Sequence, residues 1–119
     1  MDDIYILNKS DFPFLLQQIN DPPEKLYIRG NLPRKDAKNL CIVGARKHSS
    51  YGEDVCKKLI SGLKGYNICI VSGLALGIDS ISHKTAIENG LQTIAFPGSG
   101  LNENVLYPYK HRNWPSPQI

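Results

Sequence analysis

Glycine-rich turns follow two short apolar runs of this sequence and could bind an anion through main-chain N–H groups. The first turn is Gly44-Ala45-Arg46, and the second extends from Ser72 to Asp79. A β-branched run precedes each turn, and a helical pattern follows it. If the two runs are parallel neighbours in one sheet, both turns lie at the edge where open α/β sheets bind ligands. Helix N-termini at that edge would favour a phosphate or a nucleic-acid backbone.

The first turn carries cationic side chains just beyond its strand. Gly44 allows a tight turn and the close approach of a ligand to the backbone. Arg46 offers five donors in a planar fork that suits phosphate better than lysine does. Lys47, His48 and Ser49 add donors in the same loop. A glycine turn beside a surface arginine would have the same sequence, so this turn gains weight only beside the second.

The second turn has few bulky side chains near its backbone. Gly73 and Gly77 bracket a short loop, and Ser72 adds a hydroxyl group. Asp79 lies at the start of the next helix, where its carboxylate could accept N–H bonds as a structural helix cap.

Ser72, Asp79 and His83 could also be read as a catalytic triad, which we reject. Ser72 is not in a Gly-x-Ser-x-Gly elbow. Asp79 and His83 are four residues apart on one helix and can form a simple hydrogen-bonded pair. No third ligand of a suitable type is near them in the sequence, so we expect neither a catalytic nor a metal site.

A third turn, Pro97-Gly98-Ser99-Gly100, should lie at the same edge and could add N–H donors or close the site. None of the three turns matches Gly-x-Gly-x-x-Gly, and no Gly-Lys-Ser/Thr occurs, so we expect no nucleotide cofactor. Further along, aromatic and cationic residues interleave over residues 107–114. They could stack on bases or anchor the tail, and both readings stay open.

The elements that must position these turns follow a β-α-β-α-β order. We expect strands over 40–43, 67–71 and 92–96, the first buried on both faces. A capping box of Ser50 and Glu53 should begin the first helix, and Gly65 should end it. The second helix should cover 78–89. The apolar face of the first helix should pack on the sheet, and comprises Val55, Cys56, Leu59, Ile60 and Leu63.

Bulk properties are typical of one globular domain. The chain has 119 residues, a net charge of +3 and 41% hydrophobic residues, which permits anionic ligands without requiring them. It has no apolar run long enough for a membrane span and no secretory signal at its start. Cys41 and Cys69 should lie in buried strands and Cys56 on an apolar helix face. We therefore expect a cytoplasmic protein without disulfides.

Taken together, these turns resemble the DNA-processing protein A family, DprA or Smf. The likeness extends over about residues 10–114. It rests on Asp21-Pro22-Pro23, Leu26 to Gly30, Val43 to Arg46, Tyr51-Gly52, Val71 to Ala75, Gly77 to Asp79, His83, Thr93 to Ala95, Gly98 to Leu101 and Tyr107-Pro108.

The resemblance implies a Rossmann-like three-layer sandwich with a mainly parallel sheet that binds single-stranded DNA. The family helps to load RecA during natural transformation and is not known as an enzyme. Residues 1–39 would be an N-terminal segment with a short helix and strand, 40–114 a truncated half-domain and 115–119 a tail. An unpaired sheet edge would favour a homodimer. The implied DNA or phosphate contacts are Gly44, Ala45, Arg46, Lys47, Ser72, Gly73, Leu74, Ala75, Gly77, Asp79, Gly98, Ser99 and Gly100.

Two other interpretations remain open. One is a nucleotide-binding enzyme of the lysine-decarboxylase-like phosphoribohydrolase group, whose Pro-Gly-Gly-x-Gly-Thr motif Pro97-Gly98-Ser99-Gly100 matches only faintly. The other is an inactive folded fragment.

Overall fold

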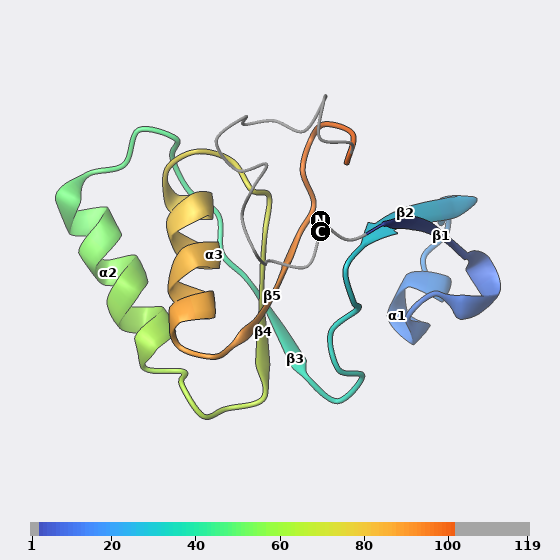
Figure 1. Cartoon of the computed structure of the whole chain (residues 1–119), viewed down its shortest axis with the longest axis horizontal. Coiled ribbons are helices and arrows are strands. Elements are labelled where there is room, and N and C mark those ends of the chain that lie inside the picture. The colour runs from blue at the N-terminus through green and yellow to red at the C-terminus, as the bar shows by residue number, and fades with distance from the viewer. Residues whose placement is uncertain (1–2, 102–119) are drawn as a thin grey trace.

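The computed structural model describes residues 3–101, whose strands form two sheets (Figure 1). In the first sheet, β1 (Ile4–Asn8) pairs with β2 (Lys25–Arg29) in an antiparallel hairpin. The connection between them contains a 3-10 turn over Lys9–Asp11 and the short helix α1 (Phe14–Gln17). A short helix and a strand were expected within residues 1–39, and α1 and β2 lie there, whereas β1 was missed although its apolar residues are typical of a strand.

The second sheet contains the predicted β-α-β-α-β unit. Its strands are β3 (Lys38–Cys41), β4 (Ile68–Ser72) and β5 (Gln92–Ala95), paired in parallel in the order β3-β4-β5. The connecting helices are α2 (Ser50–Ser61) and α3 (Ile78–Glu88). The expected α/β class with a parallel sheet is confirmed by this arrangement.

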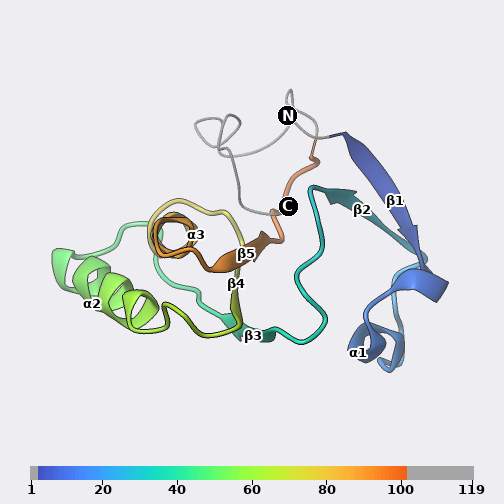
Figure 2. The ribbon, with the colours of Figure 1, turned by 60° about the horizontal axis from the view of Figure 1, so that its bottom comes forward.

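Both long helices lie on one side of the parallel sheet. Helix α3 packs on β4 and β5, and α2 packs on α3. Figure 2 shows the two helices on one side of the three strands and the β1–β2 hairpin on the other. Crossovers of one hand between successive neighbouring strands place their helices on the same face. In the described part of the chain, no helix is both long and apolar enough to cross a bilayer.

The core lies between the two helices and the central strand. Cys56 and Ile60 of α2 meet Ile70 of β4 and Ala86 of α3 there. Leu59, which we expected on the same apolar face, is 63% exposed instead. The helix packs on α3 rather than squarely over the sheet, so only part of its apolar face is covered.

Strand β3 is not buried on both faces as expected. All four of its residues are exposed, and Val43 beyond it is 70% exposed. Within residues 3–101, β3 is an edge strand that pairs only with β4.

Cys41 is therefore exposed, against expectation, whereas Cys56 and Cys69 are buried as predicted. Burial raises the pKa of the Cys69 thiol to about 11, so this thiol remains protonated at neutral pH.

The ends of α2 also differ from the predicted ones. Ser49, not Ser50, is the N-cap, because its side chain accepts a hydrogen bond from the Gly52 N–H at 3.0 Å. The helix ends at Ser61 with Gly62 as its C-cap, and Gly65 lies in the turn beyond it at φ +90°. Gln92–Ala95 and Ile78–Glu88 end within one residue of expectation. The aromatic and cationic segment 107–114 and the tail 115–119 lie outside the described residues.

Candidate nucleic-acid interface

The three predicted turns lie together at the carboxyl edge of the parallel sheet, the upper end of its strands in Figure 1. Main-chain bonds join each turn to its neighbour. The Ile78 N–H donates to the Ala45 carbonyl at 3.1 Å, which connects the first and second turns. The Phe96 N–H, just before the third turn, donates to the Ser72 carbonyl at the start of the second turn at 3.0 Å. The expected gathering of turns at one edge is therefore confirmed.

Asp79 has a different role from the predicted helix cap. The N-cap of α3 is Gly77, which makes no side-chain cap bond. The Asp79 carboxylate instead accepts the Gly44 N–H at Oδ1 (3.3 Å) and the Gly73 N–H at Oδ2 (3.1 Å). The side chain is only 7% exposed. Two of the N–H groups expected to bind an external anion therefore bind an internal one.

Two glycines are required for this close approach of the turns. A Cβ at Gly77 would lie 2.2 Å from the Ala45 carbonyl oxygen, and Gly77 has φ +82°. A Cβ at Gly44 would lie 2.7 Å from the Ile78 Cβ. Both glycines thus serve the packing of one turn on the other, a role the sequence had not distinguished from ligand approach.

Polar side chains of α3 bind the backbone of the turn that precedes them. Ser80 Oγ donates to the Ala75 carbonyl. The Leu74 N–H donates to Nε2 of His83 at 3.2 Å, although Leu74 has the unusual φ of +62°. Asp79 binds the Gly73 N–H, as described above. Side chains near the start of α3 thereby determine the conformation of the second glycine turn.

The hydrogen bonds of His83 assign its tautomer. Thr93 Oγ1 donates to the Ile70 carbonyl at 2.8 Å, so it accepts a hydrogen bond from Nδ1–H of His83 at 2.8 Å. Nε2 is then the acceptor for the Leu74 N–H. The ring is fully buried, and both nitrogens serve the structure of the turn.

Ser72 is likewise occupied in joining the strands. Its hydroxyl donates to the Ile42 carbonyl at 2.6 Å, and the side chain is buried. The three side chains considered as a triad thus bind three different sets of partners. In residues 3–101, no group of three or more His, Cys, Asp or Glu side chains could hold a metal ion.

The predicted site residues fall into an inner and an outer set. Ser72, Leu74 and Asp79 are buried, and Gly73, Ala75 and Gly77 are half-buried. The outer set is exposed, apart from the half-buried Ser99, and comprises Gly44, Ala45, Arg46, Lys47, Gly98, Ser99 and Gly100. The next residue of the loop, His48, has its side chain 3.3 Å from a Glu53 carboxylate oxygen. Arg46 and Lys47 are thus the predicted cationic contacts that this edge presents to solvent.

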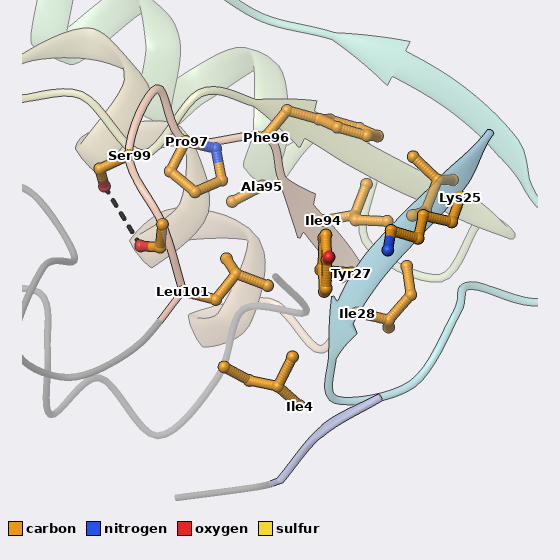
Figure 3. A pocket seen from close by; sticks show the side chains of 12 residues that line it. Ile4, Lys25, Tyr27, Ile28, Ile94, Ala95, Phe96, Pro97, Ser99 and Leu101 are labelled. Carbon is orange, nitrogen blue, oxygen red and sulfur yellow. Dashed lines mark hydrogen bonds between the residues drawn. The ribbon is translucent and has the colours of Figure 1, made fainter. Parts of the chain in front are cut away.

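Arg29 is a buried cation at the third turn that sequence reasoning missed. It lies on β2, is 7% exposed and donates from Nη1 to the Leu101 carbonyl at 2.6 Å. Between β2 and the turn after β5 lies an open cavity of about 700 Å³. Figure 3 shows Ile4, Tyr27 and Leu101 around this space. The sequence did contain a signal for this role, because Arg29 directly follows the apolar residues of β2.

Known proteins match this chain over most of its length. A family model described as DNA recombination-mediator protein A matches residues 3–117. The DNA processing protein DprA of Streptococcus pneumoniae is 41% identical over 97 residues, which is 82% of this chain and 33% of that protein. Protein Smf of Escherichia coli is 36% identical over 100 residues, which is 84% of this chain and 26% of that protein. The chain thus spans about a third or less of these relatives' length.

Two solved structures are similar to the fold. The X-ray structure of DprA from Streptococcus pneumoniae superposes with a TM-score of 0.77 at 37% identity, covering 91% of this chain and 38% of that one. DprA from Helicobacter pylori, whose structure is described as showing a unique single-stranded DNA binding mode, gives a TM-score of 0.72 at 25% identity. That match covers 95% of this chain and 51% of the other. Because the family model spans nearly the whole sequence, this chain belongs to the DNA recombination-mediator protein A family.

Proposed function

We propose that this chain binds single-stranded DNA at the carboxyl edge of its parallel sheet. The observation that carries the proposal is the exposed cationic loop at Arg46 and Lys47, placed beside the turns that follow β4 and β5. A structural relative is described as binding single-stranded DNA, which supports the same ligand. The family match favours this function over a nucleotide-cleaving enzyme.

The contacts to phosphate come mainly from side chains in this proposal. The N–H groups of Gly44 and Gly73 already have a carboxylate as their acceptor. Arg46 is exposed on the first turn and can donate two parallel bonds to one phosphate. Lys47 adds charge, and the open space at Gly98 leaves room for a DNA strand to approach the backbone.

Family membership supports three further proposals about the complete system. The chain acts as a binding module rather than an enzyme, its DNA complex is passed to RecA, and it operates in the cytoplasm where both partners are found. An association of two copies is a fourth, supported by β5, which pairs only with β4 among the described strands.

The first prediction concerns Arg46→Ala. We expect the affinity for a fluorescent oligothymidine to fall by about tenfold, because one charge-assisted phosphate contact is lost. The slope of log affinity against log salt should become shallower by about 0.7. Fluorescence anisotropy at several salt concentrations measures both quantities.

Arg34→Ala is the matched control for this measurement. Arg34 is also exposed, but its N–H binds the Gln92 side chain at the start of β5, the opposite edge of the sheet. Arg34→Ala removes the same charge as Arg46→Ala but at the other edge of the sheet. Because salt screens distant charges, the affinity for DNA should stay within about twofold of that of the unmodified chain. Equal losses for the two variants would show only a general effect of net charge and would contradict a site at Arg46.

A further inference from the structure

Asp79 lies where the two glycine turns meet, and its position deepens the proposed function, on which this inference rests. We propose that Asp79 is a positioning residue for DNA binding, whose carboxylate occupies the anion position between the turns and thereby places Arg46. The Gly44 and Gly73 amides then bind within the protein, and the Arg46 side chain is the group that contacts DNA.

The Asp79 carboxylate bridges the two glycine turns. Its two oxygens accept from two turns that are far apart in sequence, Oδ1 from Gly44 and Oδ2 from Gly73. A Cβ on Gly73 would lie 3.0 Å from Oδ2, so the carboxylate fits closely against this turn. The side chain also lies in the first turn of α3, where the helix dipole stabilises a negative charge.

The loop that carries Arg46 is held against the N-terminus of α3. Its start is bound at Gly44 by Asp79, and its next residue, Ala45, accepts the Ile78 N–H. The carbonyl oxygens of Ala45 and Arg46 lie against Gly77, within 2.2 and 2.4 Å of where a Cβ would be. The backbone leading to the Arg46 side chain is therefore fixed on the N-terminus of α3, and Asp79 supplies the charged contact.

The Asp79 carboxylate also affects where a phosphate can bind. The buried Asp79 carboxylate accepts hydrogen bonds from the Gly44 and Gly73 amides, which could otherwise bind an external anion. A phosphate at those amides would also face a like charge at short range. The Arg46 guanidinium group therefore binds DNA outside the space between the two turns. Its position depends on the hydrogen bonds of Asp79 to Gly44 and of Ile78 to Ala45.

The experiment compares Asp79→Asn and Asp79→Ala with the unmodified chain. The asparagine has the same shape but keeps one acceptor oxygen, so one of the two amides faces an NH₂ group. We expect hydrogen exchange at the Gly44 and Gly73 amides, followed by NMR, to become at least about tenfold faster in Asp79→Ala. Affinity for oligothymidine should fall by about fivefold in both variants.

Chemical rescue separates positioning from a general loss of structure. Formate can fill the space left in Asp79→Ala and accept hydrogen bonds from the Gly44 and Gly73 amides. We expect formate, compared with chloride at equal ionic strength, to slow exchange at both amides and to restore part of the DNA affinity. Arg46→Ala should show no such rescue. Asp54→Ala, which removes an exposed carboxylate from α2, should leave amide exchange unchanged.

Several results would overturn the inference. If Asp79→Asn and Asp79→Ala fold and bind DNA as the unmodified chain does, Asp79 does not position the contact. If affinity rises because the freed amides bind phosphate, Asp79 excludes DNA rather than placing it. If Asp79→Ala does not fold, Asp79→Asn decides by its amide exchange and affinity. Failure of the proposed function appears separately, as an Arg46→Ala variant with unchanged DNA affinity.

Discussion

At the scale of single residues, the glycines of this chain have distinct physical roles. Gly77 combines φ +82° with backbone contacts that leave no space for a Cβ. Gly65 has φ +90° but open space around it, and Gly98 has open space without a positive φ. This series separates the cost of the backbone conformation from the cost of close packing.

We expect alanine substitutions to destabilise the protein least at Gly98, more at Gly65 and most at Gly77. Gly98→Ala should change the free energy of unfolding by less than about 0.5 kcal/mol. Gly65→Ala should lower it by about 1 to 2 kcal/mol, the cost of a left-handed conformation. Gly77→Ala adds overlap with the Ala45 carbonyl and should cost more than about 3 kcal/mol. Urea unfolding followed by circular dichroism measures all three, and equal effects of Gly65→Ala and Gly77→Ala would contradict the packing of the turns.

At the scale of elements, the N-terminus of α2 shows how a sequence motif can be displaced by one residue. Ser50 and Glu53 have the capping-box spacing, but Ser49 has the extended conformation of an N-cap and binds Gly52. The Glu53 carboxylate lies near His48 and Lys57 instead of reaching back to the helix start. Only Ser50 has the capping-box spacing to Glu53, so the pattern indicated the wrong one of two adjacent serines, which the backbone conformation distinguishes.

Substituting each serine tests this assignment. Ser49→Ala should lower the free energy of unfolding by about 1 kcal/mol, because the Gly52 N–H loses its acceptor. Ser50→Ala is the control in the first turn and should change it by less than about 0.5 kcal/mol. Thermal melts of the two variants provide the measurement. A larger loss of stability for Ser50→Ala would show that Ser50, as first predicted, is the N-cap.

At the scale of the whole molecule, polar contacts join the hairpin, and the segment that follows it, to the parallel sheet and the turn after β5. Arg29 of β2 binds the Leu101 carbonyl beyond the third turn, and its side chain is buried. The Arg34 N–H binds the Gln92 side chain at the start of β5. The cavity lies between these two parts of the molecule (Figure 3).

Arg29→Met should loosen this attachment. It removes a charged hydrogen bond to a backbone carbonyl, and we expect the free energy of unfolding to fall by about 2 kcal/mol. Hydrogen exchange should become faster in β1 and β2 and much less so in β4. Lys9→Met breaks the exposed ion pair with Glu24 and should cost less than about 1 kcal/mol. Unchanged exchange in the hairpin of Arg29→Met would show that apolar contacts alone hold it.

Much of the fold could be read from local patterns, since apolar periodicity and glycine stops depend on neighbouring residues. The β-α-β-α-β order and the extent of α3 follow from such patterns. The burial of β3 could not be predicted in this way, because it depends on which elements pack beside Leu40 and Val43.

Local sequence patterns were enough to predict that three turns follow three parallel strands and that Arg46 and Lys47 lie on the first turn. The hydrogen-bond partners of the turn amides instead depend on how segments that are distant in sequence pack together. Gly44 and Asp79 are 35 residues apart, and their contact exists because the second crossover brings α3 beside the first turn. A carboxylate that sequence reasoning placed at a helix cap therefore joins two turns, because hydrogen bonding depends on distance in space rather than along the chain.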